Sequence, residues 1–384
     1  MSLFDKIFGN KKQPIGQEQW FQLLNGYIPV FRSWSGDIYE RELVRESIDA
    51  RARHISKLDV TIVGTAKKSL QSKLKLAPNE WQTWSQFFYR TSSILDVYNT
   101  VFIVPVIDEY GDTTGVYPIL PLNSELIQYK GVPYIKFHFT NGETGVIELI
   151  DVGILTKFQL KNDLFGESNS ALTPTMELIN IQDQGIAEGV KSAASYRFMA
   201  TATNFRNPED LIDERKKFSR ENLEKGGGIL LFPNTFKDIK QINSNPFIVD
   251  AEQMNIIQKN VYSYFGVNED ILQNKAYGDA WSAFYEGAIE PFAKQFSEVM
   301  TKMLFTLKER QQGTSFYATS DKLQYMSNAD KLNVSAQMAD RGLMTVNEIR
   351  GIWNLPPIEG GDVRPVRGEY YHLDSNGNVT GEKQ

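Results

Sequence analysis

The pattern of hydrophobic and polar positions changes from helical to extended spacing along the first part of the chain. Between residues 37 and 57, Val44, Ile48, Ala52 and Ile55 recur at helical spacing with charged residues between them, which predicts a helix. Residues 58–63 then alternate and predict a strand. Pro78-Asn79 predicts the start of another helix with an aromatic buried face. The members of that face are Trp81, Trp84, Phe87, Phe88 and Leu95, and their spacing favours a core over a functional role.

Short extended runs follow between residues 98 and 158. The runs are 101–107, 116–120, 126–129, 134–139, 146–149 and 154–158. Turn signals separate them at 109–112, at Lys130-Gly131 and at Asn141-Gly142, and the last is a strong signal for a two-residue hairpin. We therefore expect an antiparallel β unit.

A long helix is predicted to open at Thr173-Pro174, because threonine caps helices and proline is tolerated in the first turn. If it continues to residue 201, it spans about 40 Å. Its residues are mostly small or polar, and its thin apolar stripe consists of Ile181, Ile186, Val190 and Phe198. Such a helix needs packing partners elsewhere in the chain or in another copy of it.

The second half alternates helical patterns with glycine and proline breaks. A charged helix over 207–225 is expected to end at three glycines, 226–228, and to precede a strand pair, 229–232 and 236–242. A helix over 250–265 ends at Gly266, and a longer one over 279–310 contains Pro291, which predicts a kink near residues 286–291. Beyond it come the short run 316–318, to which no element is assigned, and then a predicted helix at 328–341, a helix capped by Thr345 with Glu348, and a tail that is loose after residue 373.

The composition excludes several classes of protein. With 384 residues and 41% hydrophobic residues, the chain should fold into more than one unit. The net charge of −6 disfavours tight gripping of nucleic acid, although it permits nucleic acid to slide past. The absence of cysteine removes disulfides and thiolate sites. The longest apolar run, 101–107, is too short to span a membrane, and residues 1–12 do not resemble a secretory signal, so a cytoplasmic product is expected.

Signals for catalysis are missing from the sequence. There is no phosphate-binding loop, and His54, His138 and His372 lack metal-site spacing. The carboxylates that could be imagined as a pair have neighbours typical of helix ends and solvated faces; they are Glu252, Glu269, Asp270 and Asp279. We therefore predict a protein without catalytic residues, cofactor or metal. The surplus of helix instead favours packing between copies, for which a closed ring is the usual outcome.

Motifs spread over nearly the whole chain carry a family resemblance. They are residues 1–9, 44–58, 77–79, 116–122, 264–267, 289–292, 342–350 and 360–362. In this order they resemble the portal proteins, or head–tail connectors, of tailed bacteriophages, in the form found in many long-tailed phages. Two departures concern local loops: Asn268 stands where the family usually has proline, and residues 277–280 differ from the common start of the next helix.

The resemblance implies an α+β subunit divided as portal subunits are. By analogy, residues 1–172 would form a β-rich wing, 173–201 a stem helix, 202–244 an α/β clip and 245–266 a second stem helix. Residues 267–310 would form a channel loop and a kinked channel helix, 311–327 a return to the wing, and 328–384 a small helical crown and loose tail. The family also implies a dodecameric ring at one capsid vertex of the virion, assembled in the host cytoplasm.

The implied partners are further copies of the chain, the major capsid protein, the terminase large subunit, the head–tail adaptor protein and double-stranded DNA, but no membrane. Residues 246–310 carry nine acids and six bases, so passing phosphates meet few fixed cations. We expect weak DNA contacts from a loop formed by Gln273, Asn274, Lys275 and Tyr277, although Lys275 could simply be a solvated charge. The docking face of the clip is expected at Glu209, Asp210, Lys216, Lys217 and Arg220, which are more simply a solvated helix face.

Two other functions stay open at this point. One is a DNA-processing enzyme such as a nuclease or ligase, which the missing nucleotide loop and metal spacing disfavour. The other is a capsid adaptor or scaffold that binds protein only. Electron microscopy separates the adaptor from the portal, because only the portal forms a turbine-shaped ring with an axial hole.

Overall fold

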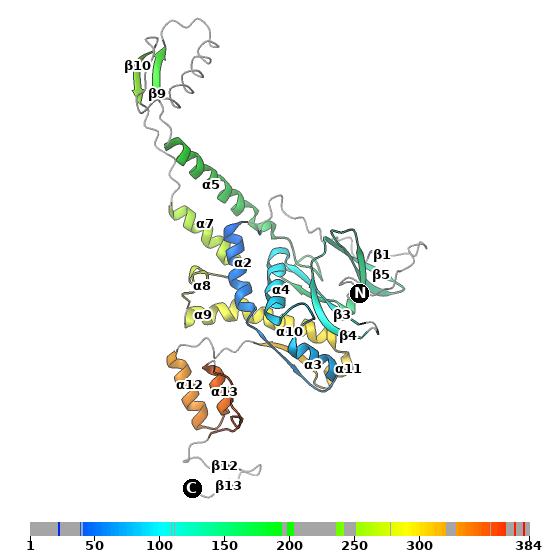
Figure 1. Ribbon diagram of the computed structural model, residues 1–384. Helices are drawn as coiled ribbons and strands as arrows, with labels where there is room; N and C mark the ends of the chain where they lie inside the picture. The colour runs from blue at the N-terminus through cyan, green and yellow to red at the C-terminus, as the bar shows by residue number, and fades with distance from the viewer. Residues whose placement is uncertain are drawn as a thin grey trace. The chain divides into compact units, whose positions relative to one another are not determined.

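The chain forms two units (Figure 1). The computed structural model describes residues 22–23, 39, 41–108, 110, 112–193, 198–202, 236–241, 251–276, 278–319, 328–353, 355–365, 372–373 and 379–380. The first unit, here called the body, comprises Met1–Leu172 and Gln258–Gln384, and the second, here called the insert, comprises Thr173–Ile257.

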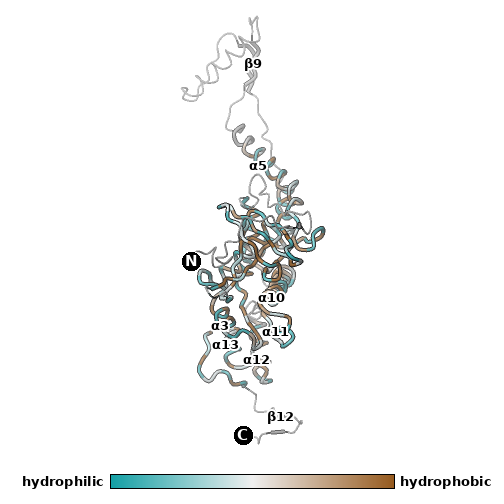
Figure 2. The backbone as a smooth tube through the Cα atoms, turned by 90° about the vertical axis from the view of Figure 1, so that its right-hand side faces the viewer, coloured by the Kyte–Doolittle hydropathy of each residue, from teal (hydrophilic) through white to brown (hydrophobic). Residues whose placement is uncertain are grey.

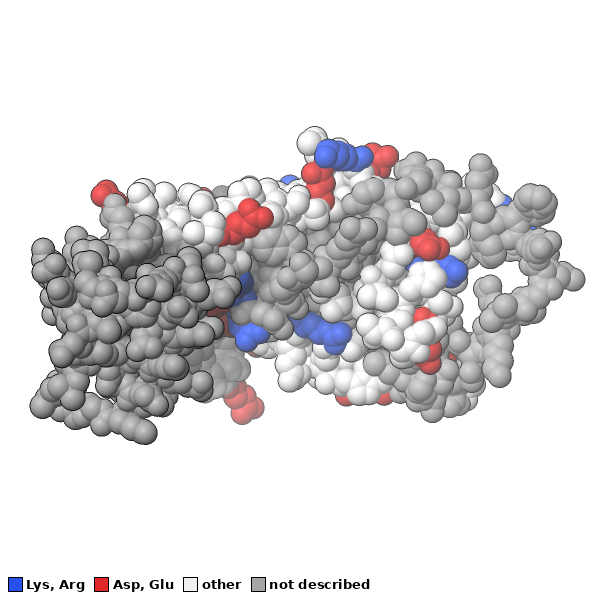
Figure 3. Space-filling model, turned by 90° about the horizontal axis from the view of Figure 1, so that it is seen from above, with Lys and Arg blue, Asp and Glu red and all other residues white. Residues whose placement is uncertain are grey.

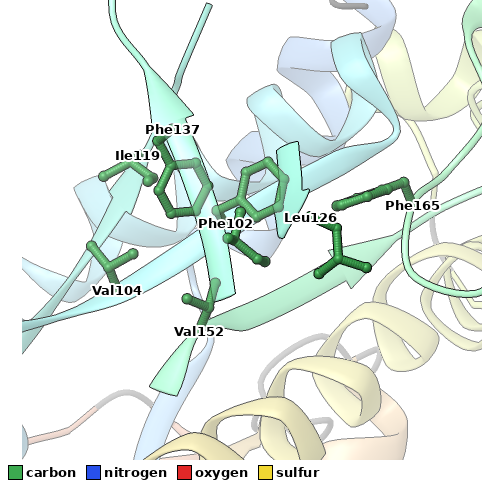
Figure 4. Close-up of a cluster of buried hydrophobic side chains, with 8 residues drawn as sticks. Phe102, Val104, Ile119, Leu126, Phe137, Val152 and Phe165 are labelled. Carbon is green, nitrogen blue, oxygen red and sulfur yellow. The ribbon is translucent and has the colours of Figure 1, made fainter. Parts of the chain in front are cut away.

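All six strands predicted between residues 98 and 158 are present, and every pairing among them is antiparallel. One sheet has the order β4-β3-β8, with β3 at Thr100–Ile107, β4 at Thr113–Ile119 and β8 at Gly153–Thr156. The other has the order β1-β5-β6-β7, with strands at Gln22–Leu23, Asn123–Tyr129, Val132–His138 and Thr144–Glu148. Strands of both sheets contribute to one cluster of buried hydrophobic side chains (Figure 4). Its members are Phe102, Val104, Ile119, Leu126, Ile135, Phe137, Val152 and Phe165.

The two-residue hairpin lies at a different turn from the one expected. Lys130 and Gly131 connect β5 to β6 directly, with φ values of 50° and 83°, the positive values that a twisted two-residue turn needs. Asn141-Gly142 belongs to a longer loop instead. There the Gly142 amide donates to the Phe139 carbonyl, and Gly142 has a φ of 81°, as in a turn followed by a bulge.

In the described residues, the N-terminal part of the body contains the helices α2 (Glu42–Ile55), α3 (Lys68–Leu76) and α4 (Trp84–Tyr98). The predicted start of α4 at Pro78-Asn79 is wrong. Thr83 caps the helix in a reciprocal capping box with Gln86, while the Asn79 side chain accepts bonds from the backbone of Trp81 and Gln82 and donates to the Val116 carbonyl. A polar residue before a helix can thus hold a turn rather than begin the helix.

An aromatic cluster joins the N-terminal and C-terminal parts of the body. Strand β2 (Asp59–Val63) pairs with β11 (Ser315–Thr319), and helix α10 (Glu290–Leu304) packs on β11. Rings of α4 contact rings of α10 and β11; the cluster consists of Trp84, Phe87, Phe88, Phe292, Phe296 and Phe316. The predicted core role is confirmed for Trp84, Phe87 and Phe88, whereas Trp81 is 44% exposed and packs at the rim against Tyr117.

The helix expected over residues 279–310 is divided. It consists of α9 (Asp279–Phe284), a π-helical segment at Tyr285–Ile289, and α10, which ends at Leu304. Phe305 is buried in extended conformation, and Thr306 caps the separate helix α11 (Leu307–Gln311) through a capping box with Glu309. The prediction of continuous helix to residue 310 is therefore wrong, because a buried aromatic ring and a new cap end it.

In the insert, α5 (Thr173–Ala193) is shorter than predicted. Phe198–Ala202 form strand β9 instead of continuing the helix, because they pair with β10 (Phe236–Gln241), and such pairing overrides local propensity. Whether β10 also pairs with the predicted strand 229–232 is untested, because that strand lies outside the described residues. Helix α7 (Ala251–Tyr264) begins in the insert and ends before Gly266, whose φ is 70°. Hydrophobic and hydrophilic positions alternate along α5 (Figure 2).

The C-terminal part contains α12 (Asn328–Asp340) and α13 (Val346–Ile352), and the predicted capping box of Thr345 and Glu348 is present. Two short strands, His372–Leu373 and Val379–Thr380, pair with each other. The predicted N-terminal stub, the helix over 207–225 and the strand 229–232 lie outside the described residues. In the described ranges, no helix combines the length and apolarity needed to span a bilayer.

Candidate functional site

The segment that the resemblance assigns to the channel lies between α7 and α10. After Gly266, Asn268 caps the short helix α8 (Glu269–Leu272) by accepting a bond from the Ile271 amide at 2.9 Å. The asparagine that departs from the family pattern therefore has a local structural role. Asn274 then adopts a φ of 56°, and the Lys275 amide bonds back to the Asp270 carbonyl at 2.7 Å, which closes the turn.

The predicted loop residues Gln273, Asn274 and Lys275 are exposed on this turn. The Lys275 Nζ donates to the Gln273 side-chain oxygen at 2.6 Å, and the Gln273 amide donates to Glu269 Oε1 at 2.7 Å. The structure thus brings Gln273 and Lys275 together and adds Glu269, which the sequence reading had treated as a solvated residue. Tyr277 lies outside the described residues.

The π-helical segment immediately precedes Pro291. The Glu290 amide bonds to the carbonyl of Tyr285, five residues back, while Pro291 has no amide hydrogen to donate to Gly287. The segment also receives a side-chain hydrogen bond from another helix: Arg51 of α2 donates from Nη2 to the carbonyl oxygen of Ala288 at 3.3 Å.

Arg51 belongs to a buried charged cluster, here called the Asp96 cluster, that also contains Asp96 of α4 and Lys157. Asp96 is fully buried; its Oδ1 accepts from Arg51 Nη1 and from Lys157 Nζ, the latter at 2.7 Å. Burial lowers the pKa of Lys157, and the Asp96 carboxylate opposes that shift. The cluster connects α2, α4 and the residue after β8 to the π-helical segment.

Asn169 forms a second buried connection, between the ends of α4 and α7. Its amide donates to the carbonyls of Asp96 and Val97 at 3.0 and 2.8 Å, and its oxygen accepts from Asn99 at 2.6 Å and from the Tyr264 hydroxyl at 2.7 Å. Burial raises the pKa of Tyr264 to about 12. The hydroxyl therefore stays protonated and can donate to Asn169.

His54 packs against aromatic rings in the core and is not part of a metal-binding group among the described residues. Its ring lies 4.7 Å from that of Trp281 and 5.5 Å from that of Phe284, both edge-to-face. Burial, followed by the charges of Lys57 and Arg53, lowers the pKa of His54 to about 4. The imidazole is neutral at pH 7 and joins α2 to α9.

The other predicted site residues fall into two groups. Pro291 stands at the start of α10, next to the π-helical segment. The proposed docking residues Glu209, Asp210, Lys216, Lys217 and Arg220 lie outside the described residues. Sequence reasoning missed Arg51 and Asp96, although each interrupts the apolar stripe of its helix, and that interruption is the signal of a buried charge pair.

In the described part of the chain, no group of three or more histidine and carboxylate side chains could hold a metal ion. On the face that Figure 3 shows, lysine and arginine side chains are interspersed with aspartate and glutamate.

Comparison with solved structures shows which class of protein has this fold. A structure titled "Neck of empty GTA particle computed with C6 symmetry" matches with a TM-score of 0.61 and 14% identity, covering 88% of this chain and 96% of that one. A neck of the native particle, computed with C12 symmetry, matches with a TM-score of 0.55 and 15% identity, over 83% and 91%. An HK97 family phage portal protein from Corynebacterium diphtheriae matches with a TM-score of 0.51 and 10% identity, over 74% and 94%. The α+β fold is therefore that of portal subunits.

The family model for "Phage portal protein" matches residues 42–354. The chain belongs to the phage portal protein family. No curated protein matches its sequence significantly.

Proposed function

We propose that the chain is a structural subunit that assembles with copies of itself into a ring and that the ring conducts double-stranded DNA during packaging and ejection. The ring would stand at one capsid vertex of the virion, in contact with the major capsid protein, after assembly in the host cytoplasm. Family membership supports the role, and the C12 symmetry of one similar neck supports twelve subunits. The proposal contains no catalytic step.

The exposed apolar face of α5 carries the proposal. Ile181 is 65% exposed and Leu178 50% exposed, in a helix of 21 residues. Burying such a side chain contributes about 1.5–3 kcal/mol, which a single subunit forgoes here. Neighbouring copies are the partners that cover this face in a ring, where every subunit presents the same surface.

In the proposed channel, the turn after α8 supplies one cation, Lys275. Lys275 is exposed and held by Gln273, while residues 246–310 as a whole carry more acids than bases. Phosphates can then exchange a weak contact for the next one as the duplex moves. Gln273, Asn274 and Tyr277 complete this proposed loop.

At the clip, we propose a docking face for the terminase large subunit first and for the head–tail adaptor afterwards. Its charged residues are Glu209, Asp210, Lys216, Lys217 and Arg220. Reversing the charges of Lys216 and Lys217 should reduce motor docking before it affects folding. A loss of solubility alone would oppose this assignment.

Electron microscopy of the purified full-length chain tests the proposed function. We expect rings with an axial hole wide enough for a duplex. Monomers or filaments under all assembly conditions would instead favour a protein-only adaptor, and cleavage or sealing of DNA with added divalent ions would favour an enzyme.

A further inference from the structure

Helix α3 concentrates positive charge in an otherwise acidic chain. The chain has a net charge of −6, yet residues 60–79 contain four lysines and no acid. The lysines are Lys67, Lys68, Lys73 and Lys75, all exposed. The folding of the helix does not by itself explain why four lysines are clustered here without an acidic residue.

The helix separates its apolar and cationic residues. Leu70, Gln71 and Leu74 are buried against the body, and the Gln71 amide holds the preceding turn through the carbonyls of Gly64 and Ala66. The outer surface, here called the α3 lysine face, presents Lys68, Ser69, Ser72, Lys73 and Lys75. One side of the helix therefore anchors it and the other carries hydroxyls and ammonium groups only, before the exposed Leu76 at its end.

Among the described residues, Lys67 is the one of the four lysines whose ammonium group has a hydrogen-bond partner. Lys67 donates to the Leu304 carbonyl at 2.6 Å and is the lysine that acts on the nearby carboxylates of Glu309 and Asp151. Within the described ranges, no ion pair neutralises Lys68, Lys73 or Lys75. These three charges are available to an external anion.

Helix stability accounts for only part of the arrangement. Lys73 and Lys75 lie in the last turn, where cations favour the helix dipole. Lys68 lies in the first turn, which has no acidic residue, and there the dipole opposes a cation. Its position is unfavourable for the helix alone and becomes favourable when an anion binds.

We propose that the α3 lysine face binds the phosphate backbone of double-stranded DNA on the outside of the subunit. Lysines and serines contact phosphates without reading bases, whereas protein interfaces are depleted of lysine and enriched in aromatic residues and arginine. From Lys68 to Lys75 the helix rises about 10 Å, alongside about six phosphate charges of a duplex.

The α3 lysine face is separate from the proposed channel. Binding of DNA by this face would be a role additional to the proposed conduit function. Figure 1 draws α3 and α8 at opposite sides of the body, so Lys275 and the α3 lysine face do not form one patch. A ring could therefore hold DNA outside its channel as well as pass DNA through it.

Covalently closed circular duplex DNA tests the inference, because it cannot thread through a closed ring. We would measure its binding by full-length protein in gel-shift titrations over a series of NaCl concentrations. The variant Lys68→Gln/Lys73→Gln/Lys75→Gln should reduce the slope of log Kobs against log salt by about 2–3, since each phosphate contact contributes about 0.9. The control Lys130→Gln/Lys136→Gln/Lys161→Gln loses the same charge elsewhere in the body and should keep the wild-type slope.

Two results in the titrations would overturn the inference: no binding of circular DNA by the wild type, or equal salt slopes for the two triple variants. Binding of polyglutamate by the wild type as strongly as circular DNA would also overturn it, because it would indicate an acidic protein as the occupant. Circle binding that depends on the α3 lysine face, in a protein without rings in micrographs, would uphold the inference and reject the proposed function.

Discussion

Asp96 is a fully buried carboxylate shared by two cations. Its carboxylate lies between two cations, Arg51 and Lys157, and Arg51 also donates to the Ala288 carbonyl of the π-helical segment. Removing the shared anion leaves the buried Arg51 and the partly buried Lys157 as neighbouring positive charges without a counter-charge. A buried charge without its partner is far more costly than a surface ion pair.

We expect Asp96→Ala to lower the free energy of unfolding by about 3–5 kcal/mol. The control is Arg53→Ala, which breaks a half-exposed pair with Asp49 one helical turn away and should cost about 0.5 kcal/mol. Urea unfolding followed by circular dichroism measures both. Equal losses in the two variants would mean that the Asp96 cluster contributes no more than a surface pair.

Lys275 gives a second prediction at this scale, which depends on the conduit. Lys275→Glu should weaken retention or packaging of linear duplex DNA while rings form normally, because it replaces an exposed cation of the proposed loop by an anion. Lys161→Glu, in an exposed loop of the body, is the matched control. If Lys275→Glu packages DNA at the wild-type rate, Lys275 is a solvated charge that makes no DNA contact.

At the scale of elements, Asn169 determines how the ends of α4 and α7 meet. It satisfies two carbonyls at the end of α4 and also accepts the Tyr264 hydroxyl from α7. The segment before Asn169 also packs closely on the end of α4, since a Cβ added at Gly166 would lie 2.1 Å from the Asn99 carbonyl oxygen. A side chain of another shape at position 169 would leave several buried polar groups unpaired.

Asn169→Ala should therefore destabilise the protein by about 2–3 kcal/mol, and Tyr264→Phe, which removes one hydrogen bond and keeps the ring, by about 1 kcal/mol. Amide hydrogen exchange near the ends of both helices should rise more in the first variant. If Tyr264→Phe lowers the free energy of unfolding as much as Asn169→Ala does, Asn169 does not stabilise the two helix ends through several hydrogen bonds.

For the whole molecule, the proposed ring assembly depends on apolar surface of α5 that the subunit leaves exposed. Ile181→Asp places a charge on the exposed apolar face of α5, where a ring would bury it at each repeated contact. We expect the variant to keep the circular dichroism of the folded subunit and to lose rings in micrographs and in light scattering.

Ala187→Asp is its matched control, since Ala187 is exposed on the same helix and lies about 120° around the helix axis from Ile181. That variant should assemble as the wild type does. If Ile181→Asp forms as many rings as the wild type, the exposed apolar face of α5 does not provide the contact between subunits.

The sequence by itself determined the features that depend on neighbours along the chain. The strands between residues 98 and 158, the capping box at Thr345, the break at Gly266 and the order of motifs that marks the portal family all follow from local spacing and residue type. Helix α3 escaped prediction because only Leu70, Gln71 and Leu74 face the body, too few for a clear period.

Tertiary structure decided whatever depends on residues distant in sequence. Pairing with β10 turned Phe198–Ala202 into a strand, and a buried Phe305 ended α10 at Leu304. The Asp96 cluster joins residues 45 and 61 positions away from Asp96, and Arg51 reaches a carbonyl 237 positions further on. Spacing along one helix cannot specify such contacts, because the energy of a buried charge depends on partners that only the folded chain brings to it.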